Sequence, residues 1–177
     1  MIELKRITTG DSRHYAYMEQ LLTASFPEEE YRDLKALREY TDTVPCFYCN
    51  IILEDATSVG LITYWDLAGF YYIEHLAIDP DRRNKGYGRK LLEHLADFFK
   101  KPVVLEVEYP VDETTRRRIS FYQRHGYTLW EKEYFQPPYR NGHGKLRMYL
   151  MAKGNLNPEE SFESIKKKIH GAVYNQG

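Results

Sequence analysis

Apolar positions along the chain recur at two spacings, and together they predict alternating strands and helices. In runs such as 2–7, apolar and polar residues alternate, and this period of two is typical of a strand with one buried face. In the stretch 89–99, apolar residues return every three or four positions, which is typical of a helix. The predicted strands are 2–7, 46–54, 59–66, 71–78, 102–108, 127–135 and 145–153, and the predicted helices are 12–24, 30–41, 88–100, 114–125 and 158–174. This order predicts a mixed α/β fold.

The lengths of the connections indicate how the strands pair. The three strands between residues 46 and 78 are joined by short turns, so we expect them to form a meander. The helix 88–100 lies between strands 71–78 and 102–108, and a crossover of this kind makes the two strands parallel. The last two strands are expected to form an antiparallel pair joined by the loop 136–144. With 177 residues and 21.1 kDa, the chain is long enough for one domain with a full core.

The C-terminal stretch carries apolar residues on one face of a predicted helix, namely Phe162, Ile165, Ile169 and Val173. We therefore expect the extension 154–177 to pack on the same domain, or else to form a dimer contact. The lysine run 166–168 in this helix is expected to be a solvated face.

The composition is that of a globular protein and excludes several classes. Hydrophobic residues make up 42% of the chain and charged residues 29%, and the formal net charge is −1. A near-zero charge argues against nonspecific nucleic-acid binding, which needs a basic surface. No apolar run approaches the roughly 20 residues that span a bilayer, and the first residues lack the apolar core of a secretory signal. We expect a cytoplasmic protein with no membrane or nucleic-acid partner.

The two cysteines have the spacing Cys46-x-x-Cys49, which invites a zinc or redox interpretation. Zinc would need two more ligands, and no second pair of cysteines exists. A thioredoxin-like motif would lie at the start of a helix, whereas 45–53 predicts a strand. We expect two structural thiols and no metal.

A turn with two glycines lies between the apolar run 73–78 and the helix that follows. Gly86 and Gly88 lack a Cβ, so the backbone can turn tightly and its N–H groups can approach an anion. The next helix directs its unpaired N–H groups and the positive end of its dipole to the same place. Cationic residues crowd around this turn, namely Arg82, Arg83, Lys85, Arg89 and Lys90. A Gly-x-Gly turn alone most often only begins a helix, but the added charge favours a bound diphosphate.

The same turn fits a dinucleotide-binding fingerprint less well. That fingerprint needs a third glycine three residues after the second, and Leu91 stands there. Nicotinamide or flavin binding is therefore the weaker interpretation.

Two motifs in this order resemble the GCN5-related N-acetyltransferase (GNAT) family. Arg83-x-x-Gly86-x-Gly88, after the strand 73–78, resembles that family's coenzyme A pyrophosphate motif, and 121–127 (Phe-Tyr-Gln-Arg-His-Gly-Tyr) resembles its second signature. The resemblance implies an acyl-CoA N-acyltransferase fold, with a mostly antiparallel central sheet, a splayed parallel strand pair and flanking helices. It spans approximately 1–153, which would be the acetyltransferase domain.

The resemblance also implies the cosubstrate and its contacts. Acetyl-CoA would bind between the splayed strands 73–78 and 103–108, with the backbone of Leu76, Ala77 and Ile78 along the pantetheine arm. The Leu76 N–H would bind the acetyl oxygen. The pyrophosphate would be bound by backbone N–H groups of Arg83, Asn84, Lys85, Gly86, Tyr87 and Gly88, with Arg82, Lys85 and Arg89 reaching phosphates by side chain.

Two side chains are candidates for proton transfer in a direct transfer from acetyl-CoA to a primary amine. Tyr122 in the second signature would act as general acid, since a phenol of pKa near 10 stays protonated when a thiolate of pKa about 8.5 departs. Alternatively, Tyr122 only packs in the core or contacts the coenzyme sulfur. Glu74 would act as general base because it shares strand parity with Leu76. Alternatively, Glu74 pairs with an arginine, or a water chain replaces it; Glu108 is a weaker candidate, and His75 points to the other face.

The chain departs from the family pattern at Thr115 and Arg118, where an asparagine and a small residue are usual. Thr115 would still hydrogen-bond the coenzyme. The acceptor, a small molecule or a peptide, stays open; acids at 28–30 and 33 would attract a cation or merely stabilise a helix start. The alternative to an active enzyme is a noncatalytic acyl-CoA-binding or interaction domain.

Overall fold

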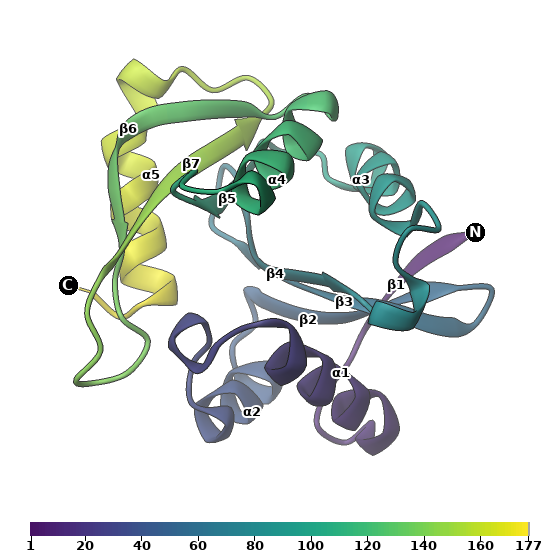
Figure 1. Ribbon diagram of the computed structural model, residues 1–177. Coiled ribbons are helices and arrows are strands. Elements are labelled where there is room, and N and C mark those ends of the chain that lie inside the picture. Colours follow the sequence, from purple (N-terminus) through teal and green to yellow (C-terminus); the bar gives the residue numbers. More distant parts are fainter. Residues whose placement is uncertain (177) are drawn as a thin grey trace. The chain divides into compact units, whose positions relative to one another are not determined.

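Strands and helices alternate in the computed structural model, which describes residues 1–176 (Figure 1). The elements are β1 (Ile2–Arg6), α1 (Ser12–Ser25), the short 3₁₀ helix η1 (Glu28–Glu30), α2 (Leu34–Thr43), β2 (Phe47–Glu54), β3 (Thr57–Asp66), β4 (Tyr71–Ile78), the 3₁₀ helix η2 (Pro80–Arg82), α3 (Tyr87–Phe98), β5 (Val103–Glu108), α4 (Glu113–Arg124), β6 (Thr128–Gln136), β7 (Leu146–Lys153) and α5 (Pro158–Val173). Within these residues the seven strands follow the order β1-β2-β3-β4-β5-β7-β6 and are mostly antiparallel, with one parallel pair. The mixed α/β fold predicted from the sequence is confirmed.

The chain divides into two compact units, and the strand β4 begins in the second and continues in the first. The first unit contains residues 1–66 and 73–98, and the second contains 67–72 and the residues from 99 onward. The division expected at residue 153 stays a prediction. Residue 177, the last of the predicted extension, lies outside the described residues.

The first unit is built on an antiparallel meander. β1 pairs with β2, and β2 pairs with β3 through the two-residue turn at Asp55 and Ala56, both of which have a positive φ. The helices α1 and α2 lie on one face of these strands, and α3 lies on the other (Figure 1). The strands are buried on both faces, so their central residues are almost continuously apolar.

The second predicted helix begins later than the sequence pattern indicated. Instead of a helix over 30–41, the chain forms η1 and then α2 from Leu34. The Asp33 side chain accepts hydrogen bonds from the N–H groups of Lys35 and Ala36, at 2.9 and 3.3 Å, and so caps α2. The acidic run Glu28–Glu30 is therefore not the first turn of an α-helix, because Asp33, which caps α2, lies three residues after Glu30.

The second unit is an antiparallel sheet with helices against it. β7 lies between β5 and β6 and pairs antiparallel with both. α4 contacts β5 and β6, and α5 packs along β6, where the Phe162 ring meets the rings of Trp130 and Tyr134. The four apolar residues predicted to share one face of α5 are all buried.

Two further sequence interpretations concern metals and membranes. Both cysteines are free thiols, and Cys49 is buried in β2. Among residues 1–176, no group of three or more histidines, cysteines or carboxylates is arranged to bind a metal ion. No helix formed by these residues has the length and apolar character needed to cross a bilayer.

Candidate active site

The turn between β4 and α3 presents backbone N–H groups that bond to no acceptor in the described part of the chain. Asn84 has φ +62° and Gly86 has φ +80°, so the chain reverses through two left-handed positions. The first helical bond runs from the Lys90 N–H to the Gly86 carbonyl, at 3.0 Å. Within residues 1–176 the N–H groups of 84–89 donate to no acceptor. Unpaired donors at the N-terminal end of a helix form an anion-binding site.

The cations around this turn differ in what they already bind. Arg83 Nε donates to the Ile78 carbonyl at 3.2 Å, Arg89 pairs with Glu93 at 3.2 Å, and Lys90 pairs with Glu54 at 3.1 Å. Arg82 and Lys85 form no ion pair with any of residues 1–176. These two side chains are therefore the cations best able to meet a phosphate.

The strand that leads into this turn is held close to its neighbour by a glycine that sequence analysis missed. A Cβ built on Gly60 in β3 would lie 2.4 Å from the Ala77 carbonyl oxygen in β4. No side chain fits at that distance, so glycine is required at residue 60. The sequence signal was a lone glycine inside a strand pattern, which marks a close approach of two backbones.

Glu74 in β4 is an ion-paired, buried carboxylate. Its side chain is 1% exposed, and Arg32 Nη2 lies 2.6 Å from Glu74 Oε2. The indole Nε1 of Trp65 donates to Glu74 Oε1 at 2.7 Å. The Arg32 guanidinium in turn stacks near the rings of Tyr40 and Trp65, at 4.5 and 5.5 Å from their centroids. The arginine pairing that the sequence left open as an alternative is therefore present.

Glu106 in β5 is a carboxylate of a different kind, and sequence analysis did not select it. It accepts hydrogen bonds from four neutral donors, namely the hydroxyls of Tyr72, Tyr134 and Tyr174 and the Gln136 amide. The bond from Tyr134 is 2.6 Å long and that from Gln136 is 3.2 Å. No cation among residues 1–176 forms an ion pair with Glu106, and the residue keeps partial exposure. Burial raises the pKa of Glu106, although the four donors oppose this.

A signal for Glu106 did exist in the sequence. It is a single acidic residue inside the apolar run of β5, in a chain with sixteen tyrosines. A buried carboxylate needs donors, and tyrosine hydroxyls supply them without a charge.

Tyr122 in α4 is buried and protonated. It is 8% exposed, and burial raises its pKa to about 12, with Arg118 opposing this slightly. The ring packs edge-to-face on Phe121 and Tyr127. The hydroxyl makes no hydrogen bond with residues 1–176 and is not fully enclosed. It is therefore available to a ligand as a donor.

Thr115 uses its polar atoms to begin α4. Its N–H donates to Asp112 Oδ1 at 2.8 Å, and its hydroxyl donates to the Asp112 carbonyl at 3.0 Å. The Asp112 N–H donates back to the Thr115 hydroxyl at 3.3 Å, which completes a capping box. A coenzyme contact through Thr115 would have to replace one of these bonds. His75 is likewise engaged, because its Nε2 lies 2.7 Å from the Glu30 carbonyl.

Comparison with known proteins identifies the family. The family model described as Acetyltransferase (GNAT) family matches residues 15–127. The chain belongs to the GNAT acetyltransferase family. A solved structure from Bacteroides thetaiotaomicron, named as a candidate GNAT acetyltransferase, is 55% identical, covers 99% of both chains and superposes with a TM-score of 0.97.

Two other relatives are more distant from this GNAT protein. A Bacillus subtilis protein named as a candidate acetyltransferase, YjbC, is 35% identical over 78 residues, and the match covers 42% of this chain but only 40% of that relative. A Bacillus subtilis acetyltransferase solved with CoA is 16% identical, with a TM-score of 0.54 over 88% of this chain and 98% of that one. The latter likeness shows the fold alone. The family predicted from the two motifs is thus confirmed.

Proposed function

We propose that this GNAT protein is an acetyl-CoA-dependent N-acetyltransferase that moves the acetyl group directly to a primary amine in a ternary complex. One observation carries the proposal: the unpaired N–H groups of residues 84–89 at the start of α3, in a member of an acetyltransferase family. A diphosphate satisfies several such donors at once and complements the helix dipole. The structure of a fold relative with CoA supports the same cosubstrate class.

The contacts with acetyl-CoA follow from this assignment. The backbone N–H groups of residues 84–89 bind the pyrophosphate, whereas that of Arg83 already donates to the Pro80 carbonyl at 3.4 Å. Arg82 and Lys85 add charge. The backbone of Leu76, Ala77 and Ile78 in β4 binds the pantetheine arm, and the Leu76 N–H stabilises the oxygen that becomes negative during transfer. The close packing of Gly60 on Ala77 supports this role, because it fixes the strand that carries these groups.

Tyr122 is proposed as the general acid. Its raised pKa, about 12, keeps the hydroxyl protonated at every working pH, and the departing coenzyme thiolate needs one proton. The proton passes from the phenol to sulfur, and the phenolate is reprotonated from solvent. No covalent enzyme intermediate is required, since the amine attacks the thioester directly.

The base that receives the amine proton is proposed to be Glu106 rather than Glu74, the residue that sequence analysis predicted. Glu74 would take up a proton only by giving up its ion pair with Arg32 inside the protein. Glu106 forms no ion pair with any of residues 1–176, and burial raises its pKa, which favours proton uptake.

The experiment measures binding and turnover separately on the full chain. Calorimetry with acetyl-CoA tests the cradle, and release of free thiol across a panel of primary amines tests transfer. We expect both to be positive. Coenzyme binding without thiol release for any amine would instead support the noncatalytic acyl-CoA-binding domain.

A matched pair of glycine substitutions tests the turn itself. Gly86→Ala and Gly69→Ala each place a Cβ at a position of positive φ with open space around it. Both introduce backbone strain, but only the first puts a methyl group among the proposed phosphate donors. We expect Gly86→Ala to raise the Kd for acetyl-CoA at least about tenfold, the equivalent of 1.4 kcal/mol, and Gly69→Ala to leave it unchanged.

A further inference from the structure

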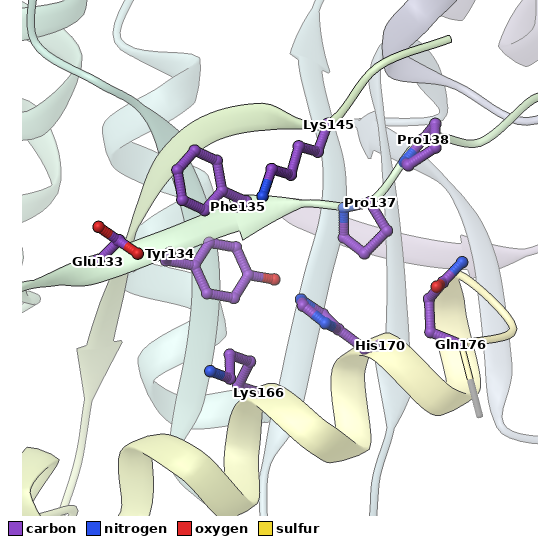
Figure 2. A pocket seen from close by; sticks show the side chains of 9 residues that line it. All are labelled: Glu133, Tyr134, Phe135, Pro137, Pro138, Lys145, Lys166, His170 and Gln176. Carbon is purple, nitrogen blue, oxygen red and sulfur yellow. The ribbon is translucent and has the colours of Figure 1, made fainter. Parts of the chain in front are cut away.

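A hollow lies between β6, the loop that follows it and α5, entirely within the second unit. It has a volume of about 360 Å³ and is lined by nine residues, namely Glu133, Tyr134, Phe135, Pro137, Pro138, Lys145, Lys166, His170 and Gln176 (Figure 2). We call this hollow the β6–α5 pocket. All of its lining lies outside the stretch 15–127 that the family model matches. Its chemistry is therefore not given by family membership.

The lining of the β6–α5 pocket is cationic over an apolar base. Two lysines and one glutamate line it, so the formal charges sum to +1 with the histidine neutral. The Lys145 ammonium lies 4.3 Å from the centroid of the Phe135 ring and pairs with no carboxylate among residues 1–176. Among the described residues, the one ion-pair partner of Lys166 is Glu163, a side chain that is 78% exposed. Water screens such an exposed pair, so both ammonium groups remain able to bind an anion.

His170 adds an unsatisfied polar atom to this lining. Its ring hydrogen-bonds the Phe135 backbone, while Nε2 is buried and has no partner among residues 1–176. Burial, and next the Lys166 ammonium one helical turn away, lower the pKa of His170. Figure 2 shows the imidazole beside the Tyr134 ring, and the two ring centroids lie 5.3 Å apart. A buried ring nitrogen without a partner is costly unless a ligand or solvent satisfies it.

One residue that lines the pocket, Tyr134, is also hydrogen-bonded to Glu106. The Tyr134 ring lines the pocket, and its hydroxyl donates to Glu106 Oε2 at 2.6 Å. Gln136 stands in the chain between the lining residues Phe135 and Pro137, and its side-chain amide donates to the other oxygen of Glu106. A ligand in the pocket is thus separated from the proposed base by a single phenol.

We propose that the β6–α5 pocket binds the body of the acceptor, and that this acceptor is an amine that also bears an anionic group, a carboxylate or a phosphate. The inference rests on the proposed function and goes beyond it by naming the acceptor class. Lys145 and Lys166 bind the anionic group, the Phe135, Pro137 and Pro138 side chains pack on its carbon skeleton, and His170 Nε2 bonds a polar group of the ligand. A polyamine, which carries only positive charge, is repelled by the same lysines.

Matched amines test the acceptor class. The first pair is phenylalanine and phenethylamine, which differ by a carboxylate, and the second is O-phosphoethanolamine and ethanolamine, which differ by a phosphate. We expect the anionic member of at least one pair to have a kcat/KM about tenfold higher, as one charge-assisted hydrogen bond provides, and the better pair identifies the anion. If both non-anionic amines are used as well as their partners, the inference is wrong although the protein is an acetyltransferase.

A binding measurement decides the inference even if no amine is acetylated. Phenylpropionate, phenyl phosphate and the neutral phenylpropanol are titrated into the protein and followed by NMR. We expect at least one anion to bind about tenfold more tightly than the alcohol, and the Lys145→Gln/Lys166→Gln double variant to lose that difference. Lys167→Gln removes one lysine charge from the helix that carries Lys166, but Lys167 is exposed and does not line the pocket, so this variant should bind as wild type does. Equal binding of acids and alcohol, or equal losses in both variants, overturns the proposal.

Discussion

Two carboxylates, one in each compact unit, lie on strands of this fold and differ in the groups that hydrogen-bond to them. Glu74 in the first unit meets a guanidinium and an indole, whereas Glu106 in the second unit meets three phenols and an amide. A cation stabilises only the ionised form of a carboxylate, so protonation of Glu74 would cost it the ion pair with Arg32. Neutral donors stabilise the same form more weakly, and burial outweighs them at Glu106, where the pKa is raised. The type of hydrogen-bond partner therefore distinguishes the two carboxylates.

The largest expected effect comes from removing the cation beside Glu74. Arg32→Met keeps much of the packing against Tyr40 and Trp65 but leaves a buried carboxylate without its ion pair. We expect a loss of about 3–5 kcal/mol in the free energy of unfolding, or roughly 6–20 °C in Tm. Thermal unfolding followed by circular dichroism measures it. The Arg32→Met/Glu74→Gln double variant should recover most of the lost stability. If Arg32→Met melts at the same temperature as wild type, the Arg32–Glu74 ion pair is not what distinguishes the two carboxylates.

The next prediction concerns kcat, which should respond differently to the loss of each carboxylate. If Glu106 is the base, Glu106→Gln lowers kcat about 100-fold or more, a typical contribution of a general base, without changing the Kd for acetyl-CoA. Glu74→Gln removes the same charge from the other strand and should lower kcat much less. Steady-state thiol release for both variants provides the measurement. The reverse ranking would return the role to Glu74, as the sequence alone predicted.

A smaller effect appears in the dependence of stability on pH. Because the pKa of Glu106 in the folded protein lies above its unfolded value, its contribution to stability is fully present below the unfolded pKa and is lost as pH rises through the folded pKa. The Glu106→Gln variant has no carboxyl group to ionise at this position, so it does not lose this stability as the pH rises. Its stability relative to wild type should therefore increase as the pH rises above about 4.3, the ordinary pKa of a glutamate. Urea unfolding at a series of pH values measures the difference, and a difference that does not vary with pH would exclude the raised pKa.

The smallest expected effect comes from deleting one donor to Glu106. Tyr174→Phe removes a hydroxyl that donates to Glu106 Oε1 and leaves the other three donors in place. Each such bond favours the ionised form, so its loss raises the pKa of Glu106 further. The rising limb of the kcat/KM profile should move to higher pH, with the plateau little changed. A lower plateau with an unmoved limb would indicate a purely structural role for the phenol cluster.

Local features of the sequence predicted much of the fold and part of the site. The turn before α3 was predictable because glycines, cations and helix periodicity lie within about a dozen residues of one another. The protonated state of Tyr122 also followed from the ordinary chemistry of a phenol, and burial only strengthens it. The predicted start of α2 was a few residues too early, because Asp33, and not one of the earlier acids, caps the helix.

What the sequence by itself determined is the order of strands and helices and the position of the glycine turn before α3, since these depend on residues that are neighbours in the chain. The tertiary structure decided which carboxylate is paired. Arg32 meets Glu74 across 42 positions, and the tyrosines on Glu106 come from as far as 68 positions away. Such contacts depend on how distant segments pack, and no local pattern contains that information. The β6–α5 pocket has the same origin, because it exists only once α5 has folded back along β6.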